Sequence, residues 1–227
     1  RGTLDRAVLL PACRIMYALC KVRGYKTVVK FVPHEVHDLE PLVALLATVP
    51  PSDYDAWQVA YSLMVWLSMV VMVPFDLSII DSSIVVSKGG DSNGGGGLTL
   101  VQSIERLALG YLGSTGVARD AAAALLARLL TRPGLQRQLE GFIDMATAKL
   151  TESSSEGGGA GSASFLVVGI YTALATIFKL GHRSELLPML AHLAPLINSP
   201  QALLGDGFVT RRKLGMKLLQ RVALVYL

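Results

Sequence analysis

Apolar residues recur at helical spacing along almost the whole of this 227-residue chain. Their period of three to four residues is typical of amphipathic α-helices, and a convincing alternation of the kind that half-buried strands show is absent. Glycines and prolines interrupt the pattern repeatedly, which indicates short helices joined by turns. The ranges that we expect to be helical are 4–20, 25–31, 35–47, 52–73, 98–112, 118–131, 135–150, 165–180, 184–197 and 210–226.

Short helices such as these are marginal alone in water, so each must bury its apolar stripe on its neighbours. A bundle could achieve this, but serial helix–turn–helix units of roughly 40 residues favour stacked pairs of the HEAT or armadillo type. We therefore expect an all-α fold, an α-solenoid of HEAT/armadillo-like helical pairs. The sequence begins at Arg1 without Met and stops at Leu227 inside an apolar run, so we expect 1–227 to be a single segment of a longer chain.

Two stretches rich in Gly and Ser interrupt the helical pattern, at about 87–97 and 151–164. They contain too few apolar residues to offset the entropy of ordering the backbone. The sequence therefore predicts two disordered, flexible insertions at these positions.

No charged residue occurs between Ala56 and Phe75, and a membrane-spanning helix needs about 20 apolar residues. The segment nevertheless contains Gln58, Ser62 and Ser68, and no Lys or Arg flanks it closely to set an orientation. We expect a buried core helix here and no membrane span.

The two cysteines, Cys13 and Cys20, are seven residues apart on one expected helix. The helical rise places them about 10 Å apart, whereas a disulfide needs Cα atoms within about 7 Å. Two free thiols are expected, which indicates a reducing, cytoplasmic environment.

Motifs for catalysis or metal binding are incomplete. The string His34-Glu35-Val36-His37 is one residue shorter than the zinc signature H-E-x-x-H. The glycines at 94–97 are not followed by the Lys of a phosphate-binding loop, and 113–116 lacks the spacing of a nucleophile elbow. His182 and His192 are isolated in the sequence, which favours structural roles. We expect no catalytic residue, metal or cofactor, and a non-catalytic binding scaffold.

Basic residues gather in two places on a chain whose formal net charge is +4. One group brackets the first turn and the other crowds the last helix. Either could be an ordinary solvated helix face, or a surface that attracts an acidic protein. Nucleic acid is a weaker alternative, because the basic groups lack interleaved aromatic residues. The residues predicted to bind a partner are Lys21, Arg23, Lys26, Arg211, Arg212, Lys217 and Arg221.

Four groups of residues resemble the β-tubulin folding cofactor D family and occur in the order found there. The first is Cys20-Lys21-Val22-Arg23-Gly24-Tyr25-Lys26 with Phe31, Pro33, His34, Glu35 and Val36; the second is Trp66-Leu67-Ser68 with Pro74-Phe75-Asp76; the third is Ala118-Arg119-Asp120-Ala121-Ala122 with Thr131-Arg132-Pro133; the fourth is Arg212-Lys213-Leu214-Gly215 with Lys217-Leu218 and Gln220-Arg221. The Gly/Ser-rich stretches depart from the family and look like lineage-specific insertions.

This resemblance implies a function that periodicity cannot indicate. Members of the family bind β-tubulin, other tubulin-folding cofactors and an Arf-like small GTPase while the α/β-tubulin heterodimer is assembled or dismantled. They also promote GTP hydrolysis by tubulin, and they act in the cytoplasm and at the microtubule cytoskeleton. Tubulin is strongly acidic, which agrees with the basic groups. The alternative is an unrelated HEAT-repeat adaptor that binds another acidic protein or nucleic acid.

Overall fold

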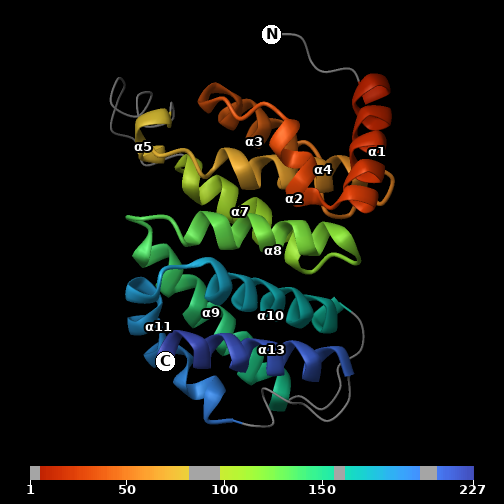
Figure 1. Ribbon diagram of the computed structural model, residues 1–227. Helices are drawn as coiled ribbons and strands as arrows, with labels where there is room; N and C mark the ends of the chain where they lie inside the picture. The colour runs from red at the N-terminus through yellow and green to blue at the C-terminus, as the bar shows by residue number, and fades with distance from the viewer. Residues whose placement is uncertain (1–5, 82–97, 156–161, 200–208) are drawn as a thin grey trace, which may run out of the picture. The chain divides into compact units, whose positions relative to one another are not determined.

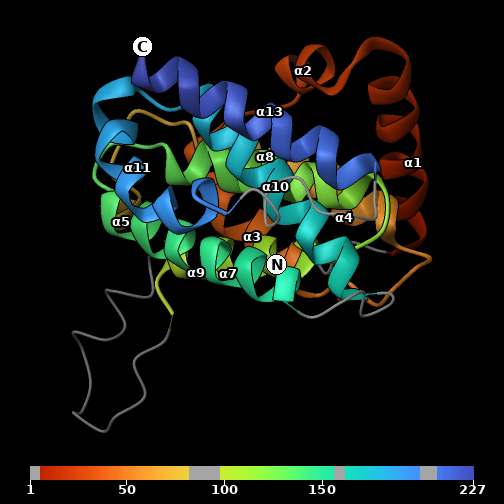
Figure 2. The same cartoon turned by 90° about the horizontal axis from the view of Figure 1, so that it is seen from below.

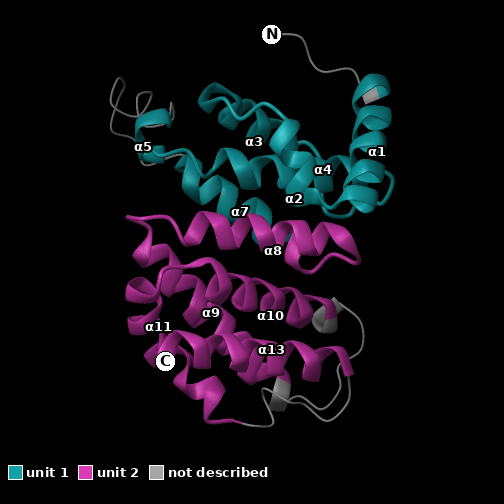
Figure 3. Ribbon diagram, in the orientation of Figure 1, with its two compact units in different colours: residues 1–110 teal, residues 111–227 magenta. Residues whose placement is uncertain are grey.

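The structure is a computed structural model that describes residues 6–81, 98–155, 162–199 and 209–227. Every regular element in these ranges is helical, which confirms the expected all-α fold (Figure 1). The chain divides into two compact units, unit 1 at Arg1–Gly110 and unit 2 at Tyr111–Leu227 (Figure 3).

Unit 1 is built around one apolar helix, α4 (Trp57–Val70). Helices α1 (Arg6–Arg23) and α3 (Leu39–Ala47) both pack against it. The remaining elements of unit 1 are α2 (Tyr25–Val28), the 3-10 turns η1 (Val29–Phe31) and η2 (Val36–Asp38), α5 (Leu77–Ile80) and most of α7 (Leu100–Leu112).

Burial of α4 confirms the expected core helix. Its buried residues include the polar Ser62 and Ser68, whose hydroxyls donate to the carbonyls of Cys13 and Val65. The helix has 14 residues and is therefore about 21 Å long, shorter than the roughly 30 Å of a bilayer core. Among the described residues no helix is long and apolar enough to cross a membrane.

Unit 2 is centred on α10 (Ser162–Leu180), which packs against α8, α9 and α13 (Figure 2). Helix α11 packs against α9 and α13 and closes one side of this unit. The neighbours of α10 are α8 (Val117–Leu130), α9 (Gln136–Ser155) and α13 (Val209–Tyr226), and α11 covers Arg183–Ile197.

The prediction of a flexible stretch at 151–164 is wrong at both ends, because α9 continues to Ser155 and α10 begins at Ser162. Hydroxyl groups near the end of α9 bond to carbonyls of the same helix: Thr151 Oγ1 donates to the carbonyls of Thr147 and Ala148, and Ser153 Oγ donates to that of Leu150. These bonds satisfy the hydroxyl groups inside the helix, where such residues are otherwise unfavourable. The middle of the stretch, 156–161, and the whole of 87–97 lie outside the described residues.

Helix α4 begins later than the expected range of 52–73. Before it, Asp53 Oδ1 accepts hydrogen bonds from the backbone N–H groups of Asp55 at 3.1 Å and Ala56 at 3.2 Å. In this Asx-turn the side-chain oxygen of the aspartate is the acceptor that a backbone carbonyl provides in an ordinary turn. The start signal at Asp53 therefore marks a turn, and the helix follows it.

Candidate partner-binding surfaces

The first basic group lies where α1 gives way to α2. Gly24 joins the two helices with φ 81°, a left-handed conformation that glycine adopts without strain. This turn places Lys21 and Arg23 in the last turn of α1 and Lys26 in α2. We call these three residues the basic turn. All three are exposed, and no carboxylate in the described residues forms an ion pair with them.

Two exposed apolar side chains accompany the basic turn. Val22 is 80% exposed and Phe31 is 85% exposed. A surface that combines cations with exposed large apolar side chains can both attract an acidic partner and bury area against it. The basic turn therefore differs in chemistry from a uniformly solvated helix face.

The second group lies on α13, whose inner face packs against α10 and α11. Gly215, Leu218, Val222 and Val225 are buried on that face. Arg212, Lys213 and Lys217 are exposed, and we call them the basic face. Met216 is exposed beside them at 54%. Lys213 and Lys217 are four residues apart, so they share one side of the helix.

Two of the residues predicted on α13 are half-buried, unlike the basic face. Arg211 Nη2 donates to Ser153 Oγ of α9 at 3.5 Å. Burial raises the pKa of the Tyr171 hydroxyl, and a hydrogen bond from Arg211 partly opposes that rise. Arg221 is also half-buried, and its Nε has no hydrogen-bond partner among the described residues. The structure thus brings Arg211 into the packing of unit 2.

A residue of α11 forms hydrogen bonds with the C-terminal end of α13. Arg183, the first residue of α11, donates from Nε to the Val225 carbonyl at 3.0 Å and from Nη2 to the Tyr226 carbonyl at 3.1 Å. Carbonyls in the last turn of a helix lack intrahelical partners, and a cation there also complements the helix dipole. This contact fixes the helix that carries the basic face.

The histidines do not form a metal site with the other residues that the structure describes. Glu35 is extended, and His37 lies in η2 with its ring 80% exposed. Thus the string His34 to His37 does not form the helix that a zinc signature requires. Among the described residues, no three His, Cys, Asp or Glu side chains are placed to hold a metal ion.

His192 is isolated in the sequence but has two carboxylate neighbours in the structure. Its Nδ1 lies 2.8 Å from Asp144 Oδ1, and its Nε2 lies 3.4 Å from Glu140 Oε1. Both carboxylates belong to α9, four residues apart, whereas His192 belongs to α11. The two ring nitrogens face different carboxylates, so the three groups do not converge on one point. They connect α9 to α11 and support the structural role expected for this histidine.

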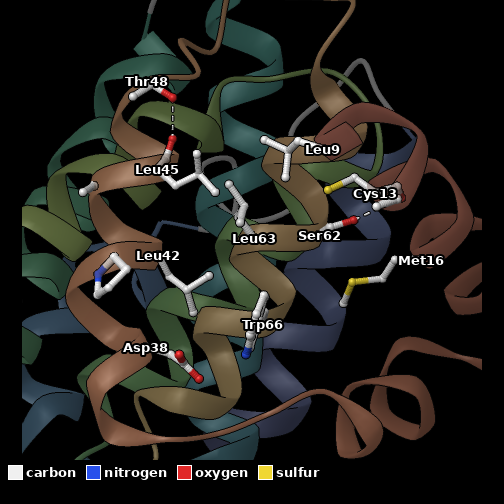
Figure 4. Close-up of a pocket in the computed structure, with 13 residues that line it drawn as sticks. Leu9, Cys13, Met16, Asp38, Leu42, Leu45, Thr48, Ser62, Leu63 and Trp66 are labelled. Atoms are coloured by element: carbon white, nitrogen blue, oxygen red, sulfur yellow. Dashed lines mark hydrogen bonds between the residues drawn. The ribbon is translucent and has the colours of Figure 1, made fainter. Parts of the chain in front are cut away.

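Sequence reasoning missed an apolar groove in unit 1, between α1 and α3 with α4 as its floor (Figure 4). Its volume is about 670 Å³, within the usual range for binding sites. Helical periodicity identifies apolar residues but does not reveal which of them neighbouring helices leave uncovered. The groove is lined by Leu9, Ala12, Cys13, Met16, Asp38, Pro41, Leu42, Ala44, Leu45, Thr48, Ser62, Leu63 and Trp66.

Comparison with known proteins identifies the family. The model of a family described as tubulin-specific chaperone D-like, ARM repeat, matches residues 2–150. The chain belongs to this family. Both the basic turn and the groove lie within the matched part of the chain, whereas the basic face lies outside it.

Two relatives extend the similarity along the chain. Tubulin-specific chaperone D of Dictyostelium discoideum is 28% identical over an alignment that covers 94% of this chain and 19% of the relative. Tubulin-folding cofactor D of Schizosaccharomyces pombe is 27% identical and is covered to 17% of its length, again over 94% of this chain. The chain thus spans less than a fifth of either relative. No solved structure was found to match it.

Proposed function

We propose that this chain is a scaffold segment of a tubulin-folding chaperone, and that it binds β-tubulin and partner cofactors during assembly and disassembly of the α/β-tubulin heterodimer. Membership of the tubulin-specific chaperone D-like family supports this function. The observation that carries it to particular residues is the exposure of the basic turn within the part that matches the family.

Charge supports an acidic protein as the partner. Exposed cations accelerate association with an acidic surface, and the effect falls as salt shortens the screening length. Exposed apolar side chains beside both basic groups add area that a protein partner can bury. We include Arg211 in the proposed surface as a positioning residue of α13, because it contacts Ser153 of α9, and Arg221 as a half-buried cation of the same helix.

The finer parts of the proposal follow from the family resemblance. The intact protein would bind an Arf-like small GTPase and the other tubulin-folding cofactors in the cytoplasm and at the microtubule cytoskeleton. It would promote GTP hydrolysis by tubulin while the chemistry takes place on tubulin. In this proposal the segment contributes binding surfaces and no catalytic group.

Charge reversal tests the proposal in the intact protein. One variant carries Lys21→Glu, Arg23→Glu and Lys26→Glu, and a second carries Arg212→Glu, Lys213→Glu and Lys217→Glu. The matched control reverses Arg14, Arg106 and Lys179, three exposed cations outside both groups. Binding of purified tubulin is measured by biolayer interferometry at low and at physiological salt.

We expect each cluster variant to weaken tubulin binding by about tenfold at low salt, with a smaller effect at higher salt. The control variant should bind as the unaltered protein does. Equal binding by cluster and control variants would remove the basic residues from the proposed contact. If the intact protein captures an RNA oligomer and leaves tubulin unbound, the adaptor alternative is favoured instead.

A further inference from the structure

The walls of the groove have the periodicity of a helix–helix interface. On α1 the lining residues Leu9, Ala12, Cys13 and Met16 are spaced i, i+3, i+4 and i+7. On the opposite wall they run from Pro41 of α3 to Thr48, the residue that follows this helix. Each wall therefore presents about two helical turns, or about 10 Å. Side chains at this spacing form the ridges and grooves into which another helix packs.

Three uncharged polar groups inside the groove already donate hydrogen bonds within the chain. Thr48 Oγ1 donates to the Leu45 carbonyl at 2.7 Å, and Ser62 Oγ donates to the Cys13 carbonyl at 3.3 Å. Trp66 Nε1 donates to the carbonyl of Pro33. An occupant thus gains little from hydrogen bonding to the floor or walls, and most of the surface that it meets is apolar.

Asp38 contributes the carboxylate of the groove lining and gives the groove a direction. Figure 4 shows it beside Trp66 at one end of the groove, with Thr48 at the opposite end of the same wall. The Asp38 side chain is 26% exposed, and its ion-pair partner within the described residues is His37, 3.6 Å away and largely exposed. A carboxylate at the end of an apolar groove complements a cationic group on an apolar ligand.

We propose that this groove binds an amphipathic helix of a partner protein. The apolar stripe of that helix lies between α1 and α3 on α4, and a Lys or Arg at one end of the stripe pairs with Asp38. Helix-in-groove binding uses anchors at i, i+3, i+4 and i+7, the spacing that both walls display. The site is separate from the basic turn and basic face and selects the opposite charge, so it stands even if those residues do not bind tubulin.

A synthetic peptide provides the probe. It is an alanine-based helix of about 14 residues, constrained by a side-chain staple because short helices are marginal in water. Leucines occupy i, i+3, i+4 and i+7, and a Lys stands at the N-terminal end of the stripe in one version and at the C-terminal end in another. Fluorescence anisotropy of the labelled peptide measures binding to the 227-residue chain.

Exposed alanines on both walls provide matched variants. Ala44 lines the groove whereas Ala47, on the same helix, does not, and both are exposed. Ala44→Glu places a charge in the apolar groove and should weaken binding by at least about tenfold, while Ala47→Glu should leave it nearly unchanged. Ala12→Glu and its control Ala18→Glu repeat the comparison on α1, in case one variant fails to fold.

Asp38→Asn tests the charge. We expect it to weaken the peptide with the better-placed Lys by about three- to tenfold, as for a partly exposed ion pair. The same peptide with Ala in place of Lys should bind both forms of the chain equally. This comparison isolates the pairing of Asp38 with the cation from any general effect of the substitution.

Four results would overturn the proposal. In the first, a peptide with the same residues in scrambled order binds as tightly as the designed one. In the second, Ala44→Glu and Ala47→Glu change peptide affinity equally. In the third, neither version of the peptide binds at about millimolar concentration. The fourth is conversion of a dimeric chain to monomers by Ala44→Glu in light-scattering measurements, since a second copy would then be the occupant.

Discussion

Gly169 of α10 lies directly against the backbone carbonyl of Leu112, the last residue of α7. A Cβ added at Gly169 would overlap that carbonyl oxygen, which is backbone and cannot turn aside. Glycine inside a helix costs roughly 1 kcal/mol relative to alanine. The close approach of the two backbones is therefore the physical reason for glycine at this position.

Gly169→Ala should lower the free energy of unfolding by about 1–3 kcal/mol, because the added methyl forces the two backbones apart. Gly141→Ala provides the control, since a Cβ at Gly141 would meet no atom within 4 Å. That substitution should raise stability by about 0.5–1 kcal/mol. Urea denaturation followed by circular dichroism compares the two variants, and equal shifts would contradict the packing argument.

Asp81 caps helix α7, whose first residue lies 19 positions later in the sequence. Its side chain is buried, and Oδ2 accepts a hydrogen bond of 2.6 Å from the N–H of Leu100, the first residue of α7. Asp81→Ala should destabilise unit 1 by about 1–3 kcal/mol, because a buried donor loses its acceptor. Asp81→Asn should destabilise unit 1 less than Asp81→Ala does, because the asparagine side chain keeps an acceptor oxygen.

Amide hydrogen exchange in the first turn of α7 is the measurement for this cap. Thr99 and Gln102 form a reciprocal capping box there, with bonds of 3.0 and 3.3 Å, so exchange should rise most at Leu100. Asp55→Ala, at an exposed position, serves as the control. Unchanged protection of Leu100 in Asp81→Ala would refute the capping role.

Arg183→Gln should lower the free energy of local unfolding at the C-terminal end of α13 by about 1 kcal/mol, because two carbonyls lose a charged donor at an exposed site. Arg183→Lys should restore only part of this, because an ammonium cannot reproduce the fork of the guanidinium. Hydrogen exchange near Val225 reports the effect locally. Identical exchange in Gln, Lys and unaltered proteins would show that the contact contributes nothing.

Burial raises the pKa of both the Cys13 and the Cys20 thiol, so the folded protein disfavours their thiolates. The stabilisation is fully present below the ordinary thiol pKa of about 8.5 and is lost as pH rises through the higher folded values. Between those values the free energy of unfolding should fall more steeply than in a Cys13→Ala, Cys20→Ala variant. Parallel pH profiles for the two proteins would contradict this prediction.

Helix positions could largely be predicted from sequence because apolar spacing reflects which face each helix buries. The prediction failed where composition alone was used, at 151–155 and 162–164, since hydrogen bonds such as that from Thr151 Oγ1 are not visible in residue frequencies. Contacts between distant residues were equally hidden. His192 and Asp144 are 48 positions apart, and no local pattern connects them.

Clustering in the sequence did not resolve which of the predicted basic residues are exposed on α13. A signal was present: Arg211 lies at helical spacing from Leu214, Leu218 and Val222, on the face that packs inward. The groove offered no comparable signal. Its existence depends on the separation of α1 and α3 across α4, which is a property of three helices and not of any one of them.

Helix α13 is tied at both ends, at Arg211 through Ser153 and at its last carbonyls through Arg183. In the proposed complex, a partner that contacts Lys213 and Lys217 would meet a backbone that these contacts already hold in place. Association would then restrict mainly side-chain rotamers, so the entropy lost on binding would be small. Arg211 would preorganise the helix that presents the exposed lysines.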